Sequence, residues 1–226
     1  MRFATKLSAL TLAVAGLATA AGAQAQSIDV RVTGTITPAA CVPNLSSGGV
    51  VDYGTISGES LNMTSFNVLP EQSVPFSIVC DAPTSVAVRT VDNRAASQVA
   101  DIQKAISADA QANNNYGLGT VSGANVGGYI MTMAQGAFTA DGESVFTVLT
   151  NDRTAPTISW TNTTGVLNHD ANSAFSWSAT SGGNPVAFSS LNGTLAVQAV
   201  LNRGEDLPLT DEVNLDGLAT LELLYL

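Results

Sequence analysis

The sequence predicts an all-β fold of the β-sandwich type, and three observations point to it. Short runs with apolar residues at every second position recur along the chain. Turn-forming stretches rich in Gly, Pro and Asn separate these runs, as is typical of short antiparallel strands in a sandwich. Charged residues make up only 12% of the chain, and no repeat or linker divides its 226 residues. We therefore expect one β-domain, which we place at residues 38–226.

Residues 1–25 have the pattern of a cleaved secretory signal. Arg2 and Lys6 precede an apolar run, and the stretch ends in Ala23-Gln24-Ala25, an A-x-A cleavage site. A membrane anchor is the alternative, but the run is too short to span a bilayer comfortably. We expect an exported protein with no membrane span after cleavage.

Residues 26–37 form an extension whose stretch "SIDVRVTGTIT" alternates strictly. Its apolar or small residues lie at every second position: Ile28, Val30, Val32, Gly34 and Ile36. This period predicts a strand with one apolar face. The strand either pairs with the chain's own sheet or fills a groove elsewhere, and the pattern leaves both open.

Further strands follow along the chain. Alternation predicts them at "SVPFSIVC" (73–80), "SVAVRTV" (85–91), "GGYIMTMAQG" (127–136), "ESVFTVLT" (143–150), "PTISWTN" (156–162), "AFSWSAT" (174–180) and "GTLAVQAVL" (193–201). Between the second and third of these, residues 93–115 break the pattern. Val99, Ile102 and Ile106 have helical spacing, which predicts a short helical insertion. A long mobile loop is the alternative.

The chain ends in a final alternating run, "LDGLATLELLYL" (215–226). Ala219, Leu221, Leu223 and Tyr225 share its apolar face. An ordinary terminal strand of a sandwich would explain this run by itself.

The two cysteines, Cys41 and Cys80, predict one disulfide. An even count in an exported chain indicates a bridge, and two cysteines allow one pairing. Two free buried thiols are the alternative. A zinc site is not expected, because one histidine and no C-x-x-C motif cannot supply its ligands.

Enzymatic and nucleic-acid functions find little support. The formal charge is −10, whereas phosphate binding needs clustered Lys and Arg. No nucleophile motif accompanies the single histidine, so we interpret it as part of a solvated turn. We expect solvated surface for the paired carboxylates and core packing for the tryptophans, and hence no catalytic residue, metal or cofactor. These residues are His169, Glu205-Asp206, Asp211-Glu212, Trp160 and Trp177.

The two ends together resemble the pilus subunits of the chaperone–usher pathway. The shared features are the alternating N-terminal segment with its embedded Gly34, Cys41 soon after it, and Cys80 at the end of "PFSIVC". The alternating C-terminal strand with penultimate Tyr225 completes the set. Residues 116–133 and the ending also look like a poorly characterised family of fimbrial-like exported proteins. The chain is longer than a common pilin, with the excess around residues 93–128.

The resemblance implies an immunoglobulin-like sandwich that lacks its last strand. A periplasmic chaperone would fill the gap first, through Ala219, Leu221, Leu223 and Tyr225, and an outer-membrane usher would then pass the subunit on. The donor strand of a neighbouring pilus subunit, Ile28 to Ile36, would replace the chaperone. The implied function is a structural subunit that moves through the periplasm to a fimbria on the cell surface. A fimbrial adhesin or carbohydrate-binding module is the alternative, and an exported hydrolase is a third.

Overall fold

The computed structural model describes residues 28–35 and 40–226, which belong to two units, Met1–Thr37 and Pro38–Leu226. In the first unit, residues 28–35 form no regular secondary structure. The apolar side chains of Ile28, Val30 and Val32 are 90%, 85% and 93% exposed. A Cβ atom on Gly34 would meet no described atom within 4 Å. Ile36 and the predicted signal at residues 1–25 lie outside the described residues.

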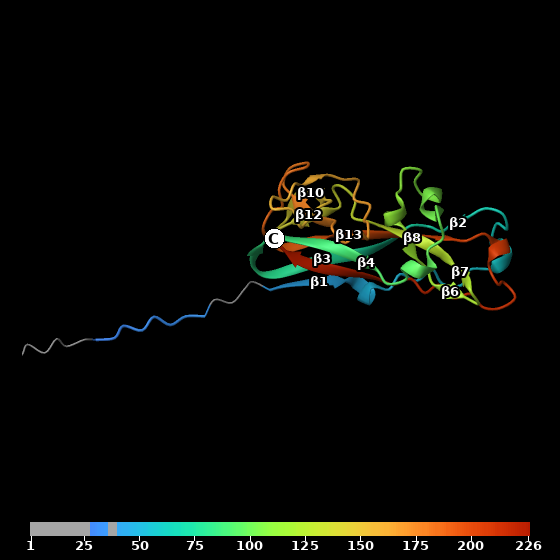
Figure 1. Ribbon diagram of the computed structural model, residues 1–226, viewed down its shortest axis with the longest axis horizontal. Helices are drawn as coiled ribbons and strands as arrows, with labels where there is room; N and C mark the ends of the chain where they lie inside the picture. The colour runs from blue at the N-terminus through green and yellow to red at the C-terminus, as the bar shows by residue number, and fades with distance from the viewer. Residues whose placement is uncertain (1–27, 36–39) are drawn as a thin grey trace, which may run out of the picture. The chain divides into compact units, whose positions relative to one another are not determined.

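The second unit is an all-β domain built on one 12-stranded sheet (Figure 1). The neighbouring strands are, in spatial order, β1 (Cys41–Leu45), β3 (Gln72–Thr84), β13 (Phe188–Leu201), β9 (Phe138–Ala140), β10 (Glu143–Thr150), β12 (Ala174–Ser178), β4 (Val86–Asp92) and β14 (Ala219–Tyr225). Shorter strands branch from this path: β2 (Asn67–Val68), β5 (Tyr116–Gly117), β8 (Gly127–Thr132) and β11 (Thr161–Asn162). The prediction of an all-β fold is confirmed.

The alternating runs form strands because each buries one face. In β3 the inward residues Val74, Phe76 and Ile78 are buried, while the residues between them face outward. Trp177 of β12 lies at the centre of the core, with ring centroids 6.3 Å from Phe76 and 5.5 Å from Phe138. β3 and β12 are not neighbours in the sheet, so these contacts join its two halves across the core.

The two tryptophans differ in their surroundings. Trp177 is fully buried, as expected. Trp160 is half-buried and precedes β11, which spans only Thr161–Asn162, so the strand predicted over residues 156–162 is mostly absent. Although this run alternates, only its last two residues pair with another strand, opposite Val148 and Leu149 of β10.

Residues 93–126 form a lobe inserted between β4 and β8, here called the inserted lobe (Figure 1, green). In place of the helix predicted from 3.6-residue spacing, it contains three 3-10 turns, η3 (Ala95–Ser97), η4 (Ile102–Ala105) and η5 (Ala112–Asn114). It also contains β5 and a two-strand hairpin, β6 (Thr120–Val121) with β7 (Ala124–Asn125).

Local side-chain chemistry explains why no longer helix forms there. Asp101 adopts a left-handed conformation with φ of 60°, which interrupts a helix. The side-chain amides of Gln98 and Asn115 donate to the backbone carbonyls of Asn115 and Val99, which lie within the lobe, and so compete with helical bonds. Of the residues with helical spacing, Ile102 is fully buried and packs over Gly128 of β8.

Candidate functional site

The two end strands of the sheet path, β1 and β14, each have one unpaired edge. Within the described residues, β1 pairs with β3 and β14 pairs with β4. The backbone N–H of Cys41 donates to the hydroxyl of Tyr225 at 2.8 Å, which brings the two edges together at one end. The sheet is therefore nearly closed, with one gap between β1 and β14.

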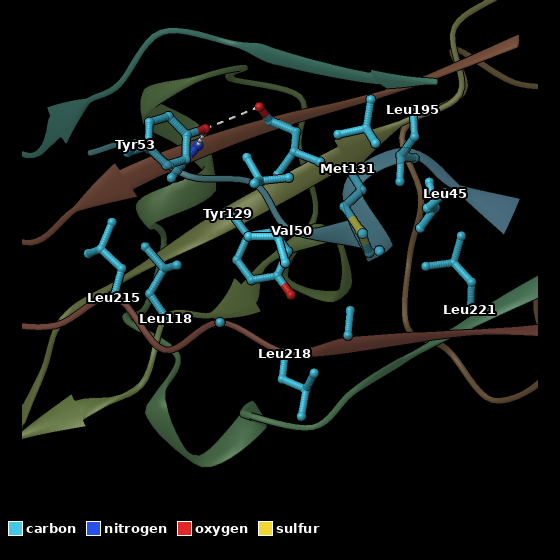
Figure 2. A pocket seen from close by; sticks show the side chains of 18 residues that line it. Leu45, Val50, Tyr53, Leu118, Tyr129, Met131, Leu195, Leu215, Leu218 and Leu221 are labelled. Atoms are coloured by element: carbon cyan, nitrogen blue, oxygen red, sulfur yellow. Dashed lines mark hydrogen bonds between the residues drawn. The ribbon is translucent and has the colours of Figure 1, made fainter. Parts of the chain in front are cut away.

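An apolar groove of about 400 Å³ occupies this gap (Figure 2). One wall begins at Leu45, the last residue of β1, and extends to Tyr53, and the other wall is Leu215–Leu221. Met131 and Tyr129 of β8 and Leu195 of β13 form the floor. The residues that line the groove carry no ionisable acid or base other than two tyrosine hydroxyls. They are Leu45, Gly48, Gly49, Val50, Val51, Tyr53, Val74, Leu118, Tyr129, Met131, Leu195, Val197, Ala199, Leu215, Gly217, Leu218, Ala219 and Leu221.

Two tyrosines shape the groove. The Tyr53 hydroxyl donates to the carbonyl of Val197 at 3.2 Å and accepts from the N–H of Ala199 at 3.1 Å. These two bonds hold the wall segment Leu45–Tyr53 against β13, although the segment does not pair with β13 as a strand. Burial raises the pKa of the Tyr129 hydroxyl well above its usual value, so the floor stays neutral over the physiological range.

A second hollow of about 730 Å³ continues from the groove and shares Val50, Val51, Tyr53 and Leu215 with it. Its floor includes Val126, Leu201 and Leu207, and its rim carries Asp52, Asp211 and Glu212. These rim carboxylates are exposed, as are Glu205 and Asp206, in agreement with the solvated surface predicted for both carboxylate pairs.

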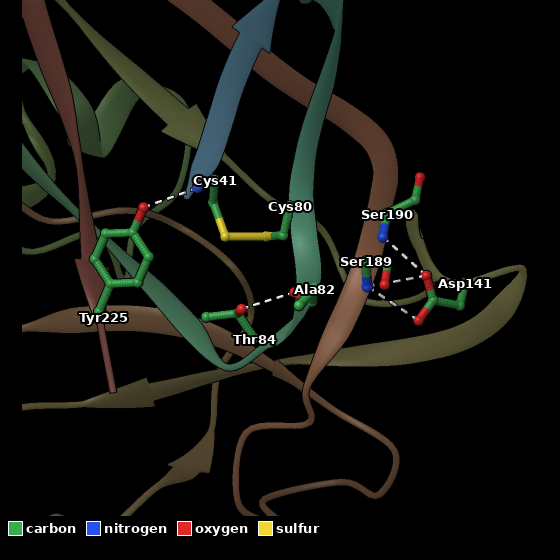
Figure 3. The surroundings of a disulfide bond; sticks show 8 residues. All are labelled: Cys41, Cys80, Ala82, Thr84, Asp141, Ser189, Ser190 and Tyr225. Carbon is green, nitrogen blue, oxygen red and sulfur yellow. Dashed lines mark hydrogen bonds between the residues drawn. A yellow bond between two sulfur atoms is a disulfide. The ribbon is translucent and has the colours of Figure 1, made fainter. Parts of the chain in front are cut away.

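The predicted disulfide is present, and it lies at the Tyr225 end of the two edges (Figure 3). Cys41 is the first residue of β1, and its Cα lies 4.0 Å from that of Cys80 on β3. The cysteines are directly paired across the two strands, and both are buried. The prediction of one bridge is confirmed.

Replacing both cysteines by alanine is expected to lower the free energy of unfolding by about 4 kcal/mol, because the open chain gains the entropy of a long loop. Urea titration of the purified, oxidised protein measures this loss. The pair Val42→Ala and Val79→Ala is a matched control, since these residues face each other in the next register position and are 66% and 58% exposed. A control that loses as much stability as the cysteine variant would contradict the expectation.

The structure brings some of the predicted site residues together. Ala219 and Leu221 line the groove, Leu223 packs half-buried against the core, and Tyr225 is 55% exposed at the edge. The extension residues from Ile28 to Gly34 belong to the other unit. Their role as a donor strand stays a prediction. Sequence reasoning missed the groove residues Tyr53, Leu118 and Tyr129, whose contacts join distant parts of the chain.

His169 does not lie in a solvated turn as predicted. It is half-buried, its ring centroid lies 5.4 Å from that of Tyr116, and its Nε2 lies 3.2 Å from the Gln98 amide nitrogen. The histidine, in the connection between β11 and β12, therefore packs against the inserted lobe. No group of three metal-ligating side chains occurs within residues 28–35 and 40–226. In the same part of the chain, no helix has the length and apolar character needed to cross a membrane.

Comparisons with known proteins identify relatives of the chain. A family model described as "Protein of unknown function (DUF1120)" matches residues 30–130, which include both cysteines and the inserted lobe. "Protein GltF" of Escherichia coli (strain K12) is 29% identical over 229 residues, with 88% of each chain covered. "Uncharacterized protein YhcF" of the same strain is 37% identical over 68 residues, which are 30% of this chain and 28% of that protein. The chain is thus related in sequence to GltF over most of its length and to YhcF over a shorter stretch.

Proposed function

We propose that this protein is a structural subunit of a surface fimbria, and that its groove binds the N-terminal segment of a neighbouring copy. The observation that carries the proposal is the uncharged groove between the unpaired edges of β1 and β14. An edge strand presents free N–H and C=O groups, and apolar pockets beside it favour an added strand with alternating side chains. Here two such edges border one gap.

The strand order is compatible with an immunoglobulin-like sandwich that lacks one strand. β10 pairs with β9 through Glu143–Val145 and with β12 through Phe146–Thr150. It therefore links a layer of β1, β3, β13 and β9 to a layer of β12, β4 and β14, with Phe76 and Trp177 in contact between them. One further strand between β1 and β14 would complete the fold.

The N-terminal segment has the properties of such a strand. Ile28, Val30 and Val32 are almost fully exposed and lie at every second position, so an extended chain would present them on one face. Burying a side chain of this kind stabilises a complex by about 1.5–3 kcal/mol before the ordering cost is subtracted. Main-chain bonds to both edges would add affinity, and the groove walls would select the side chains.

The same edge explains the other proposed partners. An exposed edge strand beside an apolar groove promotes aggregation, so an exported subunit needs protection until it is assembled. A periplasmic chaperone that covers β14 would give this protection, and an usher would exchange it for the next subunit. This role requires export, places the protein finally on the cell surface, and involves no enzymatic activity.

A synthetic peptide of residues 27–37 tests the proposal with the full-length exported chain as acceptor. Binding should protect amides on the free edges of β1 and β14 from hydrogen exchange, because the added strand supplies their missing acceptors. A peptide with Val30→Asp, which places a charge in the uncharged groove, should bind far more weakly. Failure of the first peptide to bind, or protection confined to other strands, would reject the proposal.

A further inference from the structure

The backbone of the groove wall Leu215–Leu218 is hydrogen-bonded to the inserted lobe and not to a strand of the sheet. β14 pairs with β4 from Ala219 onward, and the ladder stops there. Before that point the wall has no regular strand structure. Leu215, Gly217 and Leu218 line the groove, whereas Asp216 is absent from its lining.

Backbone bonds connect this wall to the lobe at two positions. The N–H of Asp216 donates to the carbonyl of Leu118 at 2.9 Å, and the N–H of Asn93 donates to the carbonyl of Leu218 at 2.9 Å. Leu118 itself lines the groove, so the lobe contributes both the support of the wall and part of its surface.

An ion pair closes the same junction. The guanidinium of Arg94, at the start of the lobe, donates through Nε to Asp216 Oδ2 at 3.0 Å and through Nη2 to Oδ1 at 3.0 Å. This two-point geometry fixes orientation as well as distance. The hydrogen bonds from Arg94 also hold the pKa of the Asp216 carboxyl below its ordinary value, so the pair is ionised at neutral pH.

Packing under the wall leaves little room for it to shift inward. A Cβ atom on Gly217 would lie 2.9 Å from Cε1 of Tyr129 and 3.1 Å from Cδ2 of Leu118. Glycine therefore allows the backbone to approach the floor closely, and the remaining freedom of the wall is outward, away from Leu118. The ion pair and the two backbone bonds restrain this outward movement.

We propose that the inserted lobe, through Arg94 and Asp216, holds the Leu215–Leu218 wall in place and thereby slows the release of a strand bound in the groove. Arg94 and Asp216 are positioning residues, since neither lines the groove. The inference rests on the proposed function, because it concerns the lifetime of the bound strand.

The test measures dissociation of the labelled peptide of residues 27–37 from full-length chains. Arg94→Ala and Asp216→Ala should each release the peptide about twofold to fivefold faster, because an exposed ion pair makes only a modest contribution. The double variant should be no faster than the quicker single variant, because both changes remove one interaction. High salt should speed release from the wild type and leave Arg94→Ala unchanged.

Arg89→Ala is the matched control. Arg89 pairs with Glu222 between β4 and β14, and the side chains are 24% and 40% exposed, against 33% and 65% for Arg94 and Asp216. That pair lies within the strand ladder and does not line the groove. Its removal should leave peptide release unchanged. Hydrogen exchange of the free chains should quicken at residues 215–218 in the Arg94 and Asp216 variants and stay slow in the core strands.

The outcomes separate the two proposals. If the peptide does not bind the wild-type chain, the proposed function fails and this inference fails with it. If the peptide binds but leaves the Arg94 and Asp216 variants at the wild-type rate, only the inference fails. The same holds if Arg89→Ala accelerates release equally. Recovery of slow release in the charge-swapped pair Arg94→Asp with Asp216→Arg would support the inference even if the single variants are poorly folded.

Discussion

A chain without residues 26–36 is expected to fold and to be exported, yet to form no fibres. Under the proposed function these residues are the strand that each copy donates, so their loss leaves every groove without an occupant. Of these residues the structure describes 28–35, where the apolar side chains of Ile28, Val30 and Val32 are 85–93% exposed. None of residues 28–35 belongs to the buried core. Fibre yield on the cell surface measures the first effect, and the melting temperature of the purified chain measures the second.

Gly34→Asn sharpens this test. A side chain at Gly34 meets no described atom within 4 Å, so the variant should melt like the wild type. In a neighbour's groove the added amide would have to be accommodated beside a close-packed wall, and we expect fibre formation to stop. Thr35→Asn is the matched control, since it places the same amide one residue later, on the opposite face of an extended strand. A large fall in melting temperature on deletion, with the groove otherwise filled, would falsify the donor-strand proposal.

Truncation after Glu222 is expected to cause the second large effect. The protein should be almost completely lost from the periplasm, the compartment through which the proposed function has it pass. Leu223 and Tyr225 pair with Val88 and Val86 of β4, which are 2% and 0% exposed. Without them the edge of β4 and part of the core become accessible. Loss of the half-buried Leu223 side chain alone costs on the order of 1 kcal/mol, and the free edge promotes aggregation and proteolysis. Immunoblots of periplasmic extracts measure the surviving protein.

Tyr225→Phe is the control for this truncation. It keeps the strand and the ring and removes only the hydroxyl that accepts the Cys41 N–H. A loss of about 1 kcal/mol is expected from one hydrogen bond of this kind, so the variant should accumulate nearly as well as the wild type. Normal accumulation of the truncated chain would contradict the assignment of the last four residues to the fold.

Alternation predicted the long strands well because most of them bury one face. The runs that became β3, β10 and β13 show a period of two that a half-buried strand requires. The disulfide could also be predicted, since two cysteines allow only one pairing. The run ending in Trp160 shows the limit of the method: it alternates, but it has only a two-residue strand pairing.

The groove could not be predicted from local pattern, because its parts are far apart in the chain. Tyr53 reaches Val197 and Ala199, and Arg94 reaches Asp216 across 122 residues. Nothing in the residues around Arg94 identifies that partner. The inserted lobe was misread for a related reason, since the side chains of Gln98 and Asn115 bond to backbone carbonyls of the lobe that a helix would need.

The position of the disulfide has a mechanical consequence. Cys41 is the first residue of β1, and the carbonyl of the preceding Ala40 accepts from the N–H of Asp81, so tension applied along the N-terminal segment enters the sheet beside the disulfide. The covalent bond passes this load directly to Cys80 in β3, a 13-residue strand that is paired with both β1 and β13. The disulfide therefore prevents the five residue pairs of β1 with β3 from separating one after another under load. Rupture of the domain would instead require shearing a long, doubly paired strand, and single-molecule pulling on oxidised and reduced chains should differ accordingly.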